Sequence, residues 1–248
     1  MRHLMEITLT GFAAGMVGTG LGGLIAFVVN KKGSRFMSFI IEFSAGLMMA
    51  VVCFDLLPHS FELGGLWLSV AGVLLGVITI IYLEDIINKL QKDHKPKGIN
   101  IRLKRIGILM MLGIAVHNFP EGLAVGSGFE ASVHLGLSLT LVMALHDIPE
   151  GMAMAVPMKA SGMATWKVIF YAVLTGVPTG FGALVGALLG EISKESIALC
   201  LSFAAGAMLY VVCGDLIPES KSIYRGRLST IGNILGIIIG IIISVCSH

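Results

Sequence analysis

The chain has 248 residues, of which 56% are hydrophobic and 13% are charged, and its formal net charge at pH 7 is +2. A composition this apolar excludes an ordinary soluble domain and is typical of an integral membrane protein, whose partner is the lipid bilayer. The small net charge gives no support to a nucleic-acid partner.

Apolar runs in the chain predict eight transmembrane helices. A helix needs about 20 residues to cross a hydrocarbon core of about 30 Å, and each run is long enough to do so. The predicted fold class is therefore an all-α membrane protein with a single transmembrane domain over residues 1–248. In chain order, the predicted helices cover residues 5–30, 36–58, 65–87, 105–126, 133–157, 167–190, 195–218 and 227–246.

Basic residues predict the orientation of these helices. If the amino terminus lies outside, all 17 Lys and Arg residues except Arg2 and Lys194 fall in the inner connections. Positively charged connections stay in the cytoplasm, so we expect a multi-pass protein of the plasma membrane with both termini outside. Residues 88–104 are then a cytoplasmic loop between a three-helix unit (1–87) and a helix pair (105–157), and a second three-helix unit follows (158–248).

An internal repeat predicts how the helices are arranged. Residues 43–60 and 203–220 are identical at eleven of eighteen positions without a gap, and Asp55 matches Asp215. The copies lie in the second and the seventh predicted helices, an even-numbered and an odd-numbered crossing, so they would run in opposite directions through the membrane. This predicts a 3+2+3 arrangement, in which helices 1–3 and 6–8 form an inverted repeat around helices 4 and 5. Many secondary transporters have inverted repeats.

One motif, His-Asn/Asp-x-Pro-Glu-Gly, occurs at residues 117–122 and again at residues 146–151. In each copy the histidine and the glutamate are four residues apart and share one face of a helix. Both copies fall near the middle of a predicted helix, where each carboxylate costs roughly 2.5 to 3.5 kcal/mol on insertion scales. Packing alone is unlikely to offset this, so we expect a cation to bind. The candidate metal ligands are His117, Asn118, Glu121, His146, Asp147 and Glu150.

The residue types in the motif indicate the class of metal. Imidazole, carboxylate and amide groups without a thiolate suit zinc, iron or manganese as divalent ions and argue against copper(I). Pro120 and Pro149 each remove one helical hydrogen bond, so we expect kinks that turn the ligands inward. The alternative, in which each histidine only pairs with the glutamate of its own copy, explains one motif better than two.

The doubled motif, the eight apolar segments, the outside termini and the basic loop after the third segment together resemble the ZIP (Zrt-, Irt-like) family of divalent metal transporters. The resemblance covers essentially the whole chain and is strongest to the prokaryotic branch that includes ZupT and GufA. It implies uptake of divalent metal into the cytoplasm, with zinc foremost and iron, manganese and cadmium as further candidates. It also implies a homodimer in which helices 1, 4, 5 and 6 move against helices 2, 3, 7 and 8. The metal is the substrate, and no prosthetic group is implied.

The same resemblance implies a division of the ligands between two metal ions. In the family pattern His117, Glu121, His146 and Glu150 hold the first ion, and Asn118 and Asp147 hold a second with the same glutamates. Many members carry a glutamate directly before the proline of the sixth helix, where this chain has Val177 before Pro178. One or two bound ions both remain open at this point. The basic loop has only His94 in place of the histidine-rich tract of many relatives.

The repeat also suggests residues along a transport path. Asp55 and His59 lie at the predicted outer end of their segment, and their counterparts Asp215 and Glu219 lie at the predicted inner end. We expect capture outside and release inside, with ordinary polar residues at helix ends as the alternative. Two methionines, Met48 and Met208, are candidates for soft transient ligands, with membrane packing as the alternative. Glu84, Asp85 and His134 are interpreted as boundary residues.

The mechanism predicted from these patterns is alternating access, in which the central site opens to one side of the membrane at a time. A membrane metalloenzyme is one alternative. The spacing does not match it, because zinc hydrolases use two histidines with a general-base glutamate and di-iron bundles use Glu-x-x-His. A channel-like conductor with the same ligands and no moving bundle is another alternative.

Overall fold

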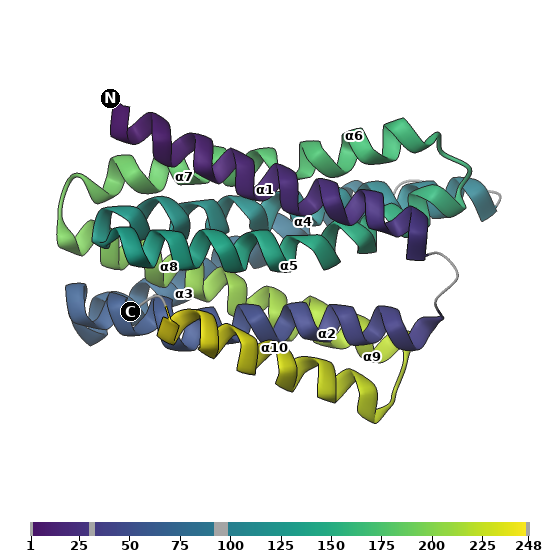
Figure 1. Ribbon diagram of the computed structural model, residues 1–248. Helices are drawn as coiled ribbons and strands as arrows, with labels where there is room; N and C mark the ends of the chain where they lie inside the picture. The colour runs from purple at the N-terminus through teal and green to yellow at the C-terminus, as the bar shows by residue number, and fades with distance from the viewer. Residues whose placement is uncertain (1, 30–32, 92–98, 247–248) are drawn as a thin grey trace.

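A computed structural model describes residues 2–29, 33–91 and 99–246 (Figure 1). These residues form helices with no strand among them, so the all-α prediction is confirmed. Two single π-helical turns, η1 (Val52–Leu56) and η2 (Val212–Leu216), each continue an α-helix. The α-helices are α1 (Arg2–Val29), α2 (Ser34–Val51), α3 (Leu57–Gln91), α4 (Ile99–Ala131), α5 (Val133–Ala160), α6 (Thr165–Thr175), α7 (Val177–Gly190), α8 (Lys194–Val211), α9 (Ile217–Ile223) and α10 (Arg227–Cys246).

Several of these helices are long and apolar enough to cross a membrane. Within the described ranges six helical stretches qualify by length and hydropathy. α4 is not one of the six. The stretches are Arg2–Phe27, Ser34–Ile87, Val133–Ala160, Thr165–Gly190, Lys194–Ile223 and Arg227–Cys246.

The stretch Ser34–Ile87 contains two of the predicted helices. Gly65 lies inside it with φ 73° and ψ 172°, which is not a helical conformation, and the chain turns back at this point. Positive φ is accessible to glycine because it has no Cβ atom. That the chain crosses the membrane eight times stays a prediction.

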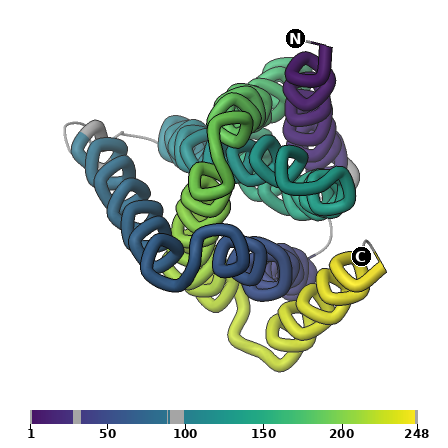
Figure 2. Tube along the Cα trace, turned by 90° about the vertical axis from the view of Figure 1, so that its left-hand side faces the viewer, coloured from purple at the N-terminus to yellow at the C-terminus, as the bar shows by residue number. Residues whose placement is uncertain are grey.

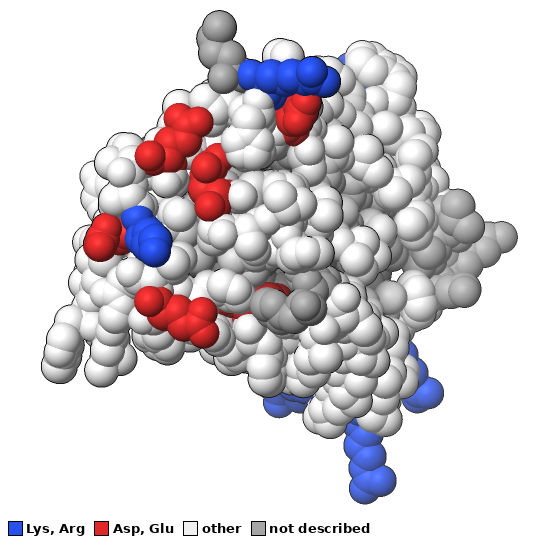
Figure 3. All heavy atoms as spheres, turned by 60° about the vertical axis from the view of Figure 1, so that its left-hand side comes forward, with Lys and Arg blue, Asp and Glu red and all other residues white. Residues whose placement is uncertain are grey.

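The two ends of the helix bundle differ in charge. Arg2 and Cys246 lie at one end of the bundle, which we call the terminal end, and acidic side chains are scattered over it (Figures 1 and 3). The opposite end, where α1 ends and α2 begins, is called the basic end. The described basic residues near it are Arg35, Lys89, Arg102, Lys104, Arg105, Lys159, Lys167, Lys221, Arg225 and Arg227.

The helices form two groups that pack on each other (Figure 2). One group contains α1, α4, α5, α6 and α7, in which α1 packs against α5 and α7, and α4 packs against α5 and α7. The other contains α2, α3, α8, α9 and α10, in which α3 packs against α8, and α10 against α2. The largest buried apolar cluster includes Leu47 of α2, Val125 of α4, Leu139 of α5 and Leu201 of α8, so it joins the two groups.

The sequence repeat is visible in the contacts of the second group. A Cβ atom at Gly46 of α2 would overlap the carbonyl oxygen of Asn233 in α10. At positions 160 residues away, a Cβ atom at Gly206 of α8 would overlap the carbonyl oxygen of Val73 in α3. Small residues allow such close approach of membrane helices. The pairs α2–α10 and α8–α3 therefore pack in the same way.

Buried serines repeat with the same spacing. Ser38, Ser220 and Ser229 are joined by hydroxyl contacts of 2.8 Å (Ser38 to Ser220) and 2.5 Å (Ser38 to Ser229). At the related positions, the Ser60 hydroxyl contacts the Ser69 hydroxyl at 2.7 Å and donates to the Ala198 carbonyl at 2.8 Å. The π-turns are related by the same spacing, since Asp55 lies in η1 and Asp215 in η2. The internal repeat of the sequence is thus also present in the packing of the helices.

Two predicted boundaries differ from the structure. The predicted helix 167–190 is two helices, because α6 ends before Gly176 and α7 starts at Val177, directly before Pro178. A proline has no amide hydrogen to donate, so a helix often restarts at this residue type. The predicted loop 88–104 is shorter than expected, because α3 continues to Gln91 and α4 starts at Ile99. Residues 92–98, including His94, lie outside the described residues.

The repeated close contacts predict a specific sensitivity to added volume. Gly206→Ala should lower the stability by about 1 to 3 kcal/mol, the usual cost of overpacking, because the new methyl group meets the Val73 backbone. Gly113→Ala is the matched control, since nothing lies within 4 Å of a Cβ atom there. Thermal unfolding in detergent measures both. Equal melting temperatures for the two variants would contradict this account of the packing.

Candidate metal centre

The six motif residues lie on two adjacent helices, α4 and α5, and all are buried. His117 is 9% exposed and Glu150 is 2% exposed, while the other four are fully buried. Both helices continue through the motif prolines without a break in their assigned helical structure. The polar groups of the motif therefore meet inside the protein, between the two groups of helices.

The histidines contact the glutamates of the opposite copy. His146 Nε2 lies 3.0 Å from Glu121 Oε1, and His117 Nε2 lies 3.6 Å from Glu150 Oε2. The alternative in which each histidine pairs with its own glutamate is therefore not the arrangement seen. Both contacts bridge α4 and α5, so the doubled motif forms one cluster and not two separate ones.

The cluster has the dimensions of a metal site. One ligand atom each from Glu121, His146 and Glu150 lies within 4.8 Å of the others. Zinc binds nitrogen and oxygen ligands at about 2.0 to 2.2 Å in tetrahedral geometry, so two ligand atoms of one ion lie about 3.4 Å apart. A small inward shift of these side chains would bring all three into contact with one ion.

Several polar atoms of the cluster are buried without a hydrogen-bond partner. They include Glu121 Oε2, both carboxylate oxygens of Glu150, and His117 Nε2. Burying such groups without a partner is costly, and native proteins rarely leave them so. A cation among these atoms would satisfy them together.

Neighbouring backbone groups orient His146. Its Nδ1 atom lies 3.0 Å from the carbonyl oxygen of Val142, and this contact directs Nε2 towards Glu121. Metal-binding histidines commonly donate their second ring nitrogen to such an acceptor. The Ser44 hydroxyl of α2 donates to the His146 carbonyl at 3.1 Å, which ties the site to the second group of helices.

Asn118 and Asp147 face a different side of the cluster. The Asn118 amide donates to the Thr175 carbonyl at the end of α6, at 2.9 Å, and its Oδ1 atom has no hydrogen-bond partner. Both carboxylate oxygens of Asp147 also lack one, and Oδ1 lies 3.6 Å from His146 Nε2. Val177 begins α7 close to this break between helices. The three-residue group with metal-site dimensions includes neither Asn118 nor Asp147.

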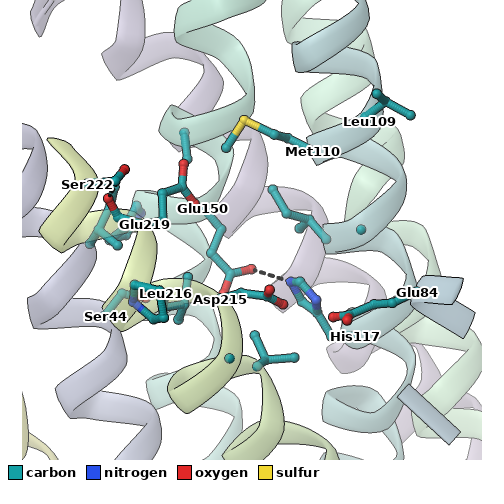
Figure 4. A pocket seen from close by; sticks show the side chains of 18 of the residues that line it. Ser44, Glu84, Leu109, Met110, His117, Glu150, Asp215, Leu216, Glu219 and Ser222 are labelled. Atoms are coloured by element: carbon teal, nitrogen blue, oxygen red, sulfur yellow. Dashed lines mark hydrogen bonds and ion pairs between the residues drawn. The ribbon is translucent and has the colours of Figure 1, made fainter. Parts of the chain in front are cut away.

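A cavity of about 590 Å³ connects the cluster to the basic end (Figure 4). His117 and Glu150 lie on its wall, together with Ile87 near the end of α3 and Ser222 near the end of α9. The walls come from helices of both groups. A hydrated ion is much smaller than this volume, so the cavity can hold one with several waters.

Three further carboxylates line the same cavity. Asp215 and Glu219, both predicted as path residues, are on the wall, and so is Glu84 of α3. The Tyr210 hydroxyl donates to Glu84 Oε2 at 3.0 Å. Our interpretation of Glu84 as a boundary residue missed this position. The structure relates this position to the repeat, because adding 160 to 84 gives Ser244, whose hydroxyl donates to Asp55 Oδ1 at 2.7 Å.

The remaining predicted path residues lie away from this cavity. Asp55 is 1% exposed, and the His59 ring contacts the Asp55 carbonyl at 2.8 Å, towards the terminal end. Met48 and Met208 are buried in the large apolar cluster. The structure therefore brings Asp215 and Glu219 together with the cluster and keeps these four residues apart from it.

Comparisons with known proteins identify the family of this chain. A family model described as ZIP Zinc transporter matches residues 88–246. The zinc transporter ZupT of Corynebacterium glutamicum is 32% identical over 94% of this chain and 95% of its own length. ZupT of Chlorobium limicola is 34% identical over 89% of this chain and 90% of its own length. The zinc transporter ZIP11 of Xenopus tropicalis is 42% identical over 53% of this chain and 41% of its own length. The chain belongs to the ZIP family.

Proposed function

We propose that this protein carries divalent metal cations, zinc foremost, across the plasma membrane into the cytoplasm. The ion binds between α4 and α5 to His117, Glu121, His146 and Glu150. The observation that carries this proposal is the crossed pairing of buried histidines and glutamates whose remaining polar atoms have no partner. Iron, manganese and cadmium are further candidate substrates, since the ligand types suit them as well.

The ZIP family consists of transporters, not enzymes, so the metalloenzyme alternative is set aside. The relatives compared above are named zinc transporters, and this supports zinc as cargo here. The substrate is the metal ion itself, and the site is where the ion exchanges water for protein ligands during its passage.

The proposed topology has eight crossings in a 3+2+3 arrangement. The turn at Gly65 divides Ser34–Ile87 into two crossings, and α6 with α7 makes one crossing despite the break at Gly176. α4 adds a further crossing, because its 33 residues are more than enough to span the hydrocarbon core. The positive-inside rule assigns the basic end to the cytoplasm and hence both termini to the outside.

The proposed direction of transport, into the cytoplasm, rests on the family resemblance, and the cavity suggests the route by which the ion leaves the site. The cavity beside His117 and Glu150 reaches the basic end, so this conformation is open to the cytoplasm. Asp215 and Glu219 line the release path, with Glu84 opposite them. Asp55 and His59 serve capture at the closed outer mouth, while Met48 and Met208 become path residues only if the bundle moves. Alternating access links the two mouths.

A second ion and a second copy of the chain complete the proposed carrier. Asn118 and Asp147 are proposed to hold a second ion, because both leave buried oxygens without a hydrogen-bond partner. Val177 offers no ligand on that side, so the second ion would be the weaker one. A homodimer in the bilayer is proposed from the family resemblance.

Removing one of the central carboxylates should abolish transport. Glu121→Ala and Glu150→Ala should each lower zinc uptake into proteoliposomes by at least about tenfold, because a lost ligand weakens ion binding and leaves the facing imidazole without its partner. Glu62→Ala is the control, because Glu62 is exposed and belongs to neither the cluster nor the cavity wall.

Uptake that is equal for the native chain and both cluster variants would refute the proposed site. The same vesicles distinguish carrier from channel. A carrier gives uptake that saturates with zinc at a rate limited by a conformational step, whereas a conductor lacks that limit.

The release path predicts a different kinetic effect. Asp215→Asn should lower the maximal rate of uptake several-fold while changing the KM for outside zinc little, since Asp215 lines the inner cavity. Asp85→Asn is the control, because Asp85 is exposed beside Glu84 without lining that cavity. Kinetics over a range of zinc concentrations separate the two parameters. Equal maximal rates for the two variants would exclude Asp215 from the release path.

A further inference from the structure

An ion pair between a buried glutamate and a partly exposed lysine lies next to the inner cavity and plays no part in the site described above. Glu42 of α2 is 2% exposed, and its Oε1 atom lies 2.8 Å from Lys221 Nζ of α9. The lysine side chain is 39% exposed and also reaches Thr230 of α10, at 3.4 Å. A carboxylate within a membrane helix is retained only when a partner compensates its charge.

The helix that carries Lys221 is short and has two different faces. α9 has seven residues between the π-turn η2 and Tyr224, which is extended. Pro218, Glu219 and Ser222 line the cavity. Ser220 and Lys221 instead contact α2, through Ser38 and Glu42. The contacts with α2 therefore decide which way Glu219 points.

The internal repeat distinguishes contacts that both halves of the chain share from contacts that only one half makes. The serine contacts of Ser220 recur 160 residues earlier, at Ser60, so they belong to both halves. The ion pair does not recur, because the positions related to Glu42 and Lys221 are Ser202 and Phe61. At the terminal end, where Ser202 and Phe61 take these positions, the corresponding short helical segment packs without such a pair. The ion pair between Glu42 and Lys221 is thus found at the basic end and has no counterpart at the related positions.

We infer that Glu42 and Lys221 form a positioning pair, which holds α9 so that Glu219 faces the cavity and thereby sets the rate of cation release at the basic end. The inference rests on the proposed function. The ion pair joins α9 to α2 at a second point beside the contact of Ser220 with Ser38, and two contacts on one face limit the rotation of a helix of two turns. An apolar pair of similar size can fill the same space without fixing that rotation.

Three variants separate positioning from simple stability. Lys221→Met leaves Glu42 as an uncompensated buried charge, and Glu42→Leu with Lys221→Met replaces the pair by apolar side chains, which often preserves or raises stability. Glu42→Lys with Lys221→Glu exchanges the charges. Arg227→Gln is the control for loss of one basic residue at this end, because Arg227 is exposed and does not line the cavity.

The experiment measures zinc uptake into proteoliposomes per folded transporter, together with the melting temperature in detergent. We expect the apolar double variant to melt near the native temperature yet to have a maximal rate several-fold lower, with an unchanged KM. Lys221→Met should show the same kinetic loss with a lower melting temperature. The charge exchange should recover much of the rate, and Arg227→Gln should match the native chain.

A native maximal rate in the apolar double variant would overturn the inference, whatever the charge exchange does, because the pair would then serve folding alone. A lower rate accompanied by a raised KM would also overturn it, since the defect would lie in capture and not in release. These results differ from failure of the proposed function, in which the native chain itself takes up no metal.

Discussion

The contacts between imidazole and carboxylate groups of α4 and α5 are the constraint on which the rest of the structure depends. His146 faces Glu121, and His117 faces Glu150, at a depth where lipid offers no hydrogen bonds. These groups are tolerated only if the two helices stay adjacent and other helices shield them on every side. α1, α2, α7 and α8 all pack against this pair. These helices thus surround the few polar side chains between α4 and α5.

The last residue of each motif makes this shielding possible. A Cβ atom at Gly122 would overlap the Thr179 carbonyl of α7, and one at Gly151 would overlap the Thr19 carbonyl of α1. Each motif therefore supplies polar ligands on one face and a close backbone contact on another. Helices α7 and α1 lie against the motif helices at the level of the glutamates, because each glycine directly follows its glutamate. Packing and ligand geometry are for this reason set by the same six residues.

Much of this could be predicted from the sequence, because lipid limits the possible structures and the motif places chemistry at defined helical positions. The all-α fold and the burial of the motif needed only hydropathy and spacing. The crossed pairing of histidines with glutamates needed the relative rotation of α4 and α5, which no single-helix pattern contains. Glu84 was missed because a carboxylate near a helix end has the same pattern whether it faces water or a cavity. The pair of Glu42 and Lys221 was missed because its members are distant in the chain.

The π-turns η1 and η2 belong to the repeated part of the sequence. Such turns are rare and are found mostly as single turns within α-helices, yet these two occupy positions 160 residues apart, each followed within two residues by a proline. Their matching positions indicate that the wide turn is encoded in the repeated stretch itself. Because the two copies run in opposite directions through the bundle, the same local sequence gives the same backbone whichever way its helix points.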